Sequence, residues 1–291
     1  MPTALSDLRK AAVFSALVVV LAMGAALVIR GLDLASGLRS SVLYMSVPAV
    51  TTLLMLLVVT RDGYRRSGLA SLGLHRLGLR AWGVAILAPL LVSVVGTAIL
   101  WATPLASFVA PADSLSTAVG FFVQLLLFTV TLSLGEELGW RGYLLPRLLA
   151  LGRTRALLVT GLVWAAWHFP LIFLTPLYHA DGNRWLVVPL FVATIGAGSY
   201  VFGYLRLWTD SMWPAALGHS AHNGVWGTLT AFTATSSPVI VNEYLVGDNG
   251  VLILLGTALV AWWLNRRLST SSRHPEHQGS PEPMVANPAA T

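Results

Sequence analysis

The stretch AAVFSALVVVLAMGAALVI, residues 11–29, decides the fold class, because it carries no charge and is long enough to cross a membrane. A helix needs about 20 apolar residues to span the roughly 30 Å hydrocarbon core of a bilayer. Arg9 and Lys10 come directly before this stretch, as basic residues do in a signal peptide. The apolar core of a signal peptide is usually only about 7–15 residues long and ends at small residues. We therefore interpret residues 11–29 as the first spanning helix.

Apolar runs of similar length recur along the rest of the chain. The length criterion gives eight candidate spans, at approximately 11–30, 41–60, 81–101, 116–138, 155–175, 185–207, 212–231 and 250–265. Of the 291 residues, 56% are hydrophobic and only 10% are charged, whereas soluble domains carry about 25% charged residues. The sequence therefore predicts an all-α polytopic membrane protein with about eight transmembrane helices, forming a single transmembrane domain over residues 1–268.

Two segments outside the predicted spans differ from the spans in composition. Residues 64–82 interleave leucines with arginine and histidine, which predicts a short interfacial helix or loop on the membrane surface. Residues 269–291 are polar and rich in proline, which predicts a disordered cytoplasmic tail. The chain has no cysteine, so disulfides, thiolate metal sites and cysteine nucleophiles are excluded.

The basic residues predict the orientation in the membrane. They gather before the first span, between the second and third, between the fourth and fifth, after the sixth and after the eighth. The alternate loops carry mainly Asp and Glu. Because basic loops stay in the cytoplasm, both termini are predicted to be cytoplasmic, which agrees with an even number of spans. The net charge of +6 is thus a topology signal, and no nucleic-acid partner is expected.

Ionisable groups are costly at membrane depth, so each one calls for a partner or a function. The sequence concentrates them in three motifs, namely GEELGWRGYLLPRL (135–148), VWAAWHFP (163–170) and GHSAHNG (218–224). In the first, Glu137 and Arg141 are four residues apart and share a helix face, which favours an ion pair. Glu136 lies about 100° around the helix from Glu137 and is left available for chemistry. A structural salt-bridge network at a helix end is the alternative interpretation.

The other two motifs supply imidazoles and an amide. His168 lies near the middle of the fifth span, where a packing hydrogen bond is the alternative to a functional role. His219 and Asn223 share one face of the seventh span, the weakest of the eight, where they could also form a polar packing stripe. His222 lies roughly 60° away from His219, as a partner to His219 or as a packing residue. A carboxylate, two imidazoles and an amide are together sufficient to activate water and stabilise an oxyanion.

At these positions the sequence resembles the CPBP family of intramembrane proteases, also called the CAAX-protease and bacteriocin-processing (Abi) family. The family motifs EExxxR, FxxxH and Hxxx(N/D) stand here as Glu136-Glu137-xxx-Arg141, Trp164-xxx-His168 and His219-xxx-Asn223, within a family core of about residues 80–235. Trp164 replaces the usual Phe.

The resemblance implies an eight-helix endopeptidase with a conical cavity open to the cytoplasm and the bilayer. By analogy, Glu136 and His168 activate the attacking water, His219 and Asn223 stabilise the oxyanion, and Arg141 holds Glu137. Eukaryotic members remove the last three residues of prenylated CAAX proteins, and some bacterial relatives are linked to bacteriocin maturation or immunity. The expected partners are membrane lipid and a peptide or protein substrate, which need not be lipidated.

Three alternatives remain open from the sequence. The same residues Glu136, His168 and His219 could bind zinc in a metal-dependent protease, although no HExxH helix is present and no cofactor is the first expectation. The ionisable residues could instead form the proton relay of a transporter, which inverted repeats would favour. A non-catalytic scaffold or immunity protein is the third alternative.

Overall fold

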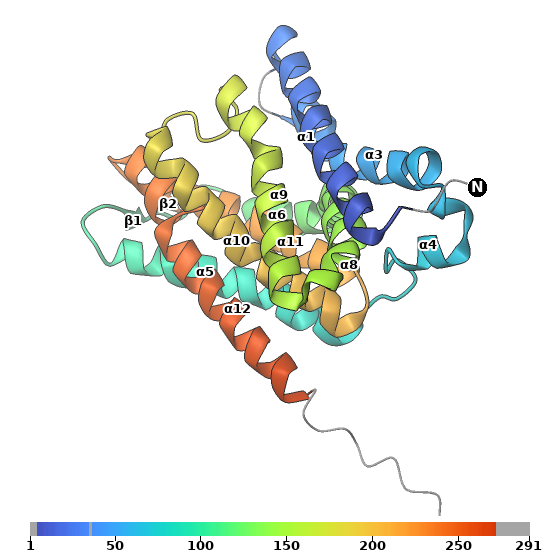
Figure 1. Cartoon of the computed structure of the whole chain (residues 1–291). Coiled ribbons are helices and arrows are strands. Elements are labelled where there is room, and N and C mark those ends of the chain that lie inside the picture. Colours follow the sequence, from blue (N-terminus) through green and yellow to red (C-terminus); the bar gives the residue numbers. More distant parts are fainter. Residues whose placement is uncertain (1–4, 35–36, 272–291) are drawn as a thin grey trace, which may run out of the picture.

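The computed structural model describes residues 5–34 and 37–271, and these residues form a helical bundle (Figure 1). Seven helical segments of the described chain are long and apolar enough to cross a membrane, which confirms the predicted fold class. They are Asp7–Gly31, Leu38–Val59, Leu79–Trp101, Ser114–Leu151, Arg153–Leu174, Arg184–Thr209 and Val251–Leu268. The predicted disordered tail lies outside the described residues, except that 269–271 form the end of the last helix.

The helical elements follow one another along the chain with few other structures between them. They are α1 (Asp7–Gly31), α2 (Leu38–Met45), α3 (Val47–Leu54), α4 (Arg66–Ala70), α5 (Trp82–Trp101), α6 (Ser114–Val130), α7 (Leu132–Glu137), α8 (Leu145–Leu148), α9 (Arg153–Leu174), α10 (Arg184–Thr209), α11 (Trp213–Ala231) and α12 (Val251–Ser271). Short 3-10 or π turns are η1 (Met55–Val59), η2 (Asp62–Tyr64), η3 (Leu79–Ala81), η4 (Leu138–Leu144), η5 (Leu149–Leu151) and η6 (Ile240–Leu245). Strands β1 (Ser107–Phe108) and β2 (Thr233–Ala234) pair antiparallel.

Helix α11 corresponds to the seventh predicted span, which is not among the seven long apolar segments named above, and it lies at the centre of the bundle. It packs against α5, α6, α7 and α10, and ten of its residues are buried. The polar residues of the third motif lower the hydropathy of α11. They are tolerated in the bundle because they face other helices and the cavity rather than lipid. Gly218 allows the close approach to α5, since a methyl group there would lie only 3.1 Å from the carbonyl oxygen of Ala85.

The fourth span differs from the predicted single helix over 116–138. The helix breaks at Thr131, whose backbone leaves the helical region (φ −126°, ψ −93°), and α7 then turns into the interior. The reason lies in the surroundings, because α6 is mainly exposed and apolar whereas α7 buries Ser133, Glu136 and Glu137. The chain then continues through the π-helical η4 to residue 151 instead of ending near residue 138.

The segment after α7 is held tightly against its neighbours. A methyl group at Gly139 would lie 2.6 Å from Cβ of Pro48, so glycine lets η4 contact α3. Arg206 of α10 donates from Nε to the carbonyl oxygen of Arg141 (3.3 Å) and from Nη2 to that of Ser71 (3.0 Å). These contacts attach the surface segment that contains α4 to the helix that carries the first motif.

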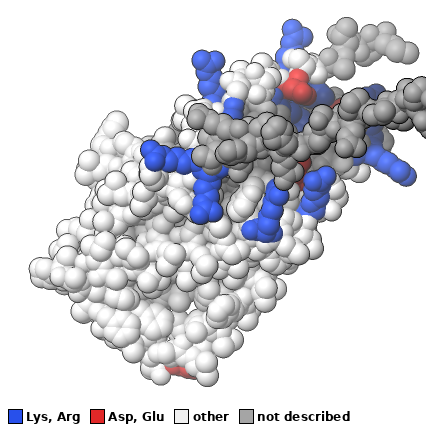
Figure 2. All heavy atoms as spheres, turned by 90° about the horizontal axis from the view of Figure 1, so that it is seen from below, with Lys and Arg blue, Asp and Glu red and all other residues white. Residues whose placement is uncertain are grey.

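The charged residues are unevenly distributed over the surface. Figure 2 shows Lys and Arg gathered toward one end of the face seen from below, whereas most of the visible surface carries no charge. Arg65 and Arg76, in the segment before α5, are exposed. The apolar remainder is the surface that a bilayer would cover.

Candidate active site

The three motifs meet at one cavity of about 340 Å³ inside the bundle. Helix α7 contributes Glu136, α9 contributes Trp164 and His168, and α11 contributes His219, His222 and Asn223. All four predicted catalytic residues therefore line the same space. Glu137 and Arg141 do not line it, and both are fully buried behind its wall.

Glu137 joins the first motif to the third. Its Oε1 atom accepts from Nη1 of Arg141 at 2.9 Å, which agrees with the ion pair predicted from the i, i+4 spacing. The same oxygen lies 3.0 Å from Nδ1 of His219. The Arg141 guanidinium also lies over the ring of Trp164, 4.6 Å from its centroid. Glu137 thus does more than hold a helix end, because it also fixes the orientation of the His219 ring.

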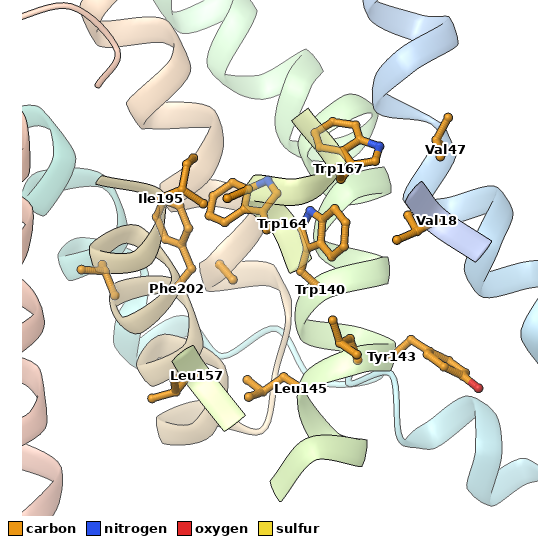
Figure 3. Packing of buried hydrophobic residues seen from close by; sticks show 14 of the residues in the cluster. Val18, Val47, Trp140, Tyr143, Leu145, Leu157, Trp164, Trp167, Ile195 and Phe202 are labelled. Atoms are coloured by element: carbon orange, nitrogen blue, oxygen red, sulfur yellow. The ribbon is translucent and has the colours of Figure 1, made fainter. Parts of the chain in front are cut away.

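Glu136 lies on the cavity side of the same helix and is only 2% exposed. Its Oε2 atom accepts from Nε1 of Trp164 at 3.2 Å and from Nε1 of Trp140 at 3.4 Å. The buried indole rings of Trp140, Trp164 and Trp167 lie close together next to Glu136 (Figure 3). The indole at position 164, where the family usually has Phe, therefore adds a hydrogen-bond donor to the carboxylate.

His168 is fixed by its own helix and by aromatic rings. Its Nδ1 atom lies 3.0 Å from the carbonyl oxygen of Trp164, and because a carbonyl only accepts, Nδ1 must carry the hydrogen. In the neutral ring Nε2 is then the basic nitrogen. Trp167, Tyr178 and Phe191 surround the imidazole, with ring centroids 4.4, 5.6 and 4.9 Å away.

His222 pairs with a residue outside the three motifs. Its Nε2 atom lies 3.0 Å from Oδ1 of Asp248, a contact that neither predicted alternative for His222 includes. The Tyr178 hydroxyl donates to the other oxygen of Asp248. Burial alone would raise the pKa of Asp248, but His222, Tyr178 and His179 outweigh it and hold the pKa well below its usual range. Burial and the Asp248 charge raise the pKa of Tyr178.

Three loop residues that line the cavity belong to the same predicted side of the membrane. Gly37, Tyr178 and Asp248 line it, and all three come from loops that the charge pattern assigns to the side opposite the arginine-rich loops. Asp248 belongs to one of these acidic loops, and nothing in its local sequence indicates a partner on α11. An opening of the cavity toward the cytoplasm stays a prediction.

The zinc alternative can be compared with these contacts. Within residues 5–34 and 37–271, no three His, Asp or Glu side chains are arranged to hold a metal ion. Oε2 of Glu136 already accepts two indole N–H groups, and Nδ1 of His219 is bound to Glu137. The absence of a cofactor stays a prediction, and the chemistry proposed below uses water and side chains.

Fold and cavity together define a polytopic helical membrane protein with a buried carboxylate–imidazole–amide site. Residues 118–225 match the family model of the Rce1-like type II CAAX prenyl endopeptidases. This match confirms the resemblance predicted from the three motifs. A curated relative, CAAX prenyl protease 2 of Methanococcus maripaludis, is 38% identical over 61 residues. These residues make up 21% of this chain and 22% of the relative, so the match spans about a fifth of its length.

Proposed function

We propose that this protein is an intramembrane endopeptidase that hydrolyses a peptide bond of a membrane-associated substrate. The observation that carries the proposal is the convergence of Glu136, His168, His219 and Asn223 on one cavity within the membrane-spanning bundle. Both matching descriptions are of proteases that act on CAAX prenyl substrates, which supports the reaction class. A substrate with a lipidated C-terminal CAAX-like sequence is the first one to test.

In the proposed reaction, Glu136 and His168 prepare the attacking water. Glu136 accepts a proton from the water, while Nε2 of His168 accepts a hydrogen bond from it and fixes its position. The hydroxide oxygen then bonds to the carbonyl carbon, and the carbonyl electrons move to its oxygen. The indole N–H groups of Trp140 and Trp164 support this assignment, because they fix the orientation of the Glu136 carboxylate.

His219 and Asn223 are proposed to stabilise the resulting oxyanion. With Nδ1 of His219 bound to Glu137, Nε2 is the nitrogen left to donate to a substrate oxygen. A protonated His219 would also neutralise the buried cluster, since Glu136 and Glu137 carry two negative charges and Arg141 carries one positive charge. The Asn223 amide is the second donor, and one such donor typically contributes about 10²–10³ in rate.

The membrane supplies the second proposed partner, which is lipid. The exposed apolar side chains of α6, among them Leu115, Phe122 and Leu126, are suited to contact with acyl chains. Gln124 and Phe128 of the same helix line the cavity, so α6 separates the site from the bilayer. A lipid-modified substrate would approach along this helix. We further propose that the arginine-rich loops and both termini face the cytoplasm.

The test is cleavage by the purified protein in lipid, compared with the Glu136→Gln variant. The substitution keeps the shape of the side chain but removes the base, so the rate should fall by about 10²–10⁴. Equal cleavage by the two proteins would contradict the assignment of Glu136.

A further inference from the structure

A second carboxylate–imidazole pair lines the cavity and has no part in the proposed attack of water. His222 and Asp248 lie 3.0 Å apart, and their side chains are only 20% and 17% exposed. Both residues line the same cavity as Glu136 and His219. A polar pair at this depth needs a reason, because its desolvation is costly.

Both carboxylate oxygens of Asp248 are bound, and one of these contacts connects Asp248 to the part of the cavity that His168 lines. Besides His222, it binds the hydroxyl of Tyr178, which in turn accepts from Nδ2 of Asn249 at 3.0 Å. The Tyr178 ring stacks on His168 with an interplanar angle of 27°. These contacts join the loop after α9 to the loop before α12 at one end of the cavity. Tyr178 and Asp248 thus lie between the imidazoles of His168 and His222.

The hydrogen bond to Asp248 determines which nitrogen of His222 can act. Since an ionised carboxylate only accepts, Nε2 carries the hydrogen that points to Asp248. Nδ1 forms no hydrogen bond with another residue in the described part of the chain, so it is the nitrogen left for a substrate. An imidazole oriented by a carboxylate on its other nitrogen is an established arrangement for proton transfer.

Peptide hydrolysis requires such a transfer, because an amine leaves poorly as an anion. We propose that His222, oriented by Asp248, is the residue that protonates the leaving amine; this rests on the proposed function. When the C–N bond of the tetrahedral intermediate breaks, its electron pair goes to nitrogen, which takes the Nδ1 proton of the His222 imidazolium. The products are a carboxylic acid and a free amine. The proton that Glu136 took from water returns to His222 through solvent and restores both groups.

The dependence on the leaving group distinguishes this role from a structural one. Two substrates with the same acyl group are compared, an N-acetyl-S-farnesylcysteinyl tripeptide and the p-nitrophenyl ester of N-acetyl-S-farnesylcysteine. The nitrophenolate leaves without protonation, whereas the amine does not. For His222→Gln we expect kcat on the peptide to fall by about 10²–10³ and kcat on the ester to change by less than about threefold. His75→Gln, at an exposed position outside the cavity, is the matched control.

Asp248→Asn tests the positioning part of the proposal. It should lower kcat on the peptide by roughly tenfold, leave KM nearly unchanged and again spare the ester. Equal losses on both substrates, in either variant, would overturn the inference while leaving the protease in place. Full activity of His222→Gln on the peptide would do the same. A wild-type protein that cleaves neither substrate would overturn the proposed function together with the inference.

Discussion

Nδ1 of His219 lies 3.0 Å from Oε1 of Glu137, although 82 residues separate the two in the sequence. The contact joins α11 to α7 inside the bundle, where both side chains are almost completely buried. Because Glu137 also neutralises Arg141, one carboxylate supports a structural cation and an imidazole of the proposed site. The two adjacent glutamates therefore have different tasks, and the same substitution should have different effects at each.

The Glu137→Gln variant should be strongly destabilised. The substitution leaves the Arg141 guanidinium, which is 0% exposed, without its counter-charge. Removing one partner of a buried ion pair typically costs about 3–5 kcal/mol. Thermal unfolding in detergent or nanodiscs measures this loss. Glu136→Gln is the matched control, since Glu136 has no salt bridge among the described residues and its loss should affect cleavage more than stability. Equal unfolding temperatures for the two variants would contradict the division of roles.

The Trp164→Phe variant should cleave more slowly although it restores the residue typical of the family. The change keeps an aromatic ring in the core but removes the indole N–H that donates to Glu136 at 3.2 Å. A hydrogen bond to a charged group contributes about 1.5–3 kcal/mol, so kcat/KM should fall by roughly tenfold or more.

The matched control for this change is Trp167→Phe. Trp167 is also buried, but its Nε1 atom has no hydrogen-bond partner in the described chain. The indole nitrogen can thus be removed there without loss of a contact to Glu136. A similar decrease in both variants would show that packing, and not the hydrogen bond to Glu136, accounts for the effect.

The sequence predicts those parts of the site that depend on helical spacing. The Glu137–Arg141 pair follows from four-residue spacing, and the convergence of three motifs follows from the cost of buried ionisable groups in a bilayer. Contacts between distant elements do not follow from spacing. Asp248 lies in a loop with no periodicity, so its pairing with His222 depends on how α12 packs against α5 and α10.

The break in the fourth span could not be predicted from the sequence either. Residues 116–135 carry no charged residue, and nothing in that pattern marks a break at Thr131. The break becomes favourable only because tertiary contacts draw α7 inward and leave α6 on the surface. Similarly, the contact of the Trp164 indole with Glu136 depends on the relative rotation of α7 and α9, which the motif FxxxH does not encode.

Acid should remove one stabilising contact at the arginine-rich end of the bundle. Burial alone would raise the pKa of Asp62, but the hydrogen bond and charge of Lys10, 2.7 Å away, together with the charge of Arg147, outweigh it and lower the pKa. A lowered pKa in the folded state stabilises the protein above the unfolded value of about 3.8, and this contribution is lost as the pH falls through the folded pKa.

The Asp62→Asn variant tests this contact. At pH 7 it should be less stable than the wild type by about 1 kcal/mol, and the difference should disappear as the pH falls through the lowered pKa of Asp62. Asp33→Asn, at an exposed position, should leave stability unchanged at both values. Stability is read from unfolding curves across the pH series. A difference that persists in acid would contradict the electrostatic origin of the effect.

The absence of cysteine makes the proposed topology directly accessible to labelling. We expect the Asp181→Cys variant to react with a membrane-impermeant maleimide in right-side-out vesicles, because its loop, residues 175–183, contains no Lys or Arg. The Arg65→Cys variant should react only after the vesicles are opened. Both positions are exposed, so burial does not limit either reaction. The reverse pattern would place the arginine-rich loops and the termini on the other side of the membrane.

The most direct test of the proposed function is cleavage of a farnesylated CAAX peptide library by the purified protein in lipid, analysed by mass spectrometry. We expect the wild-type protein to release a C-terminal tripeptide and the Glu136→Gln variant, which should remain folded, to release none. Release of the same tripeptide at the same rate by both proteins would contradict the proposed role of Glu136. The absence of any product from the wild type would contradict the proposed function.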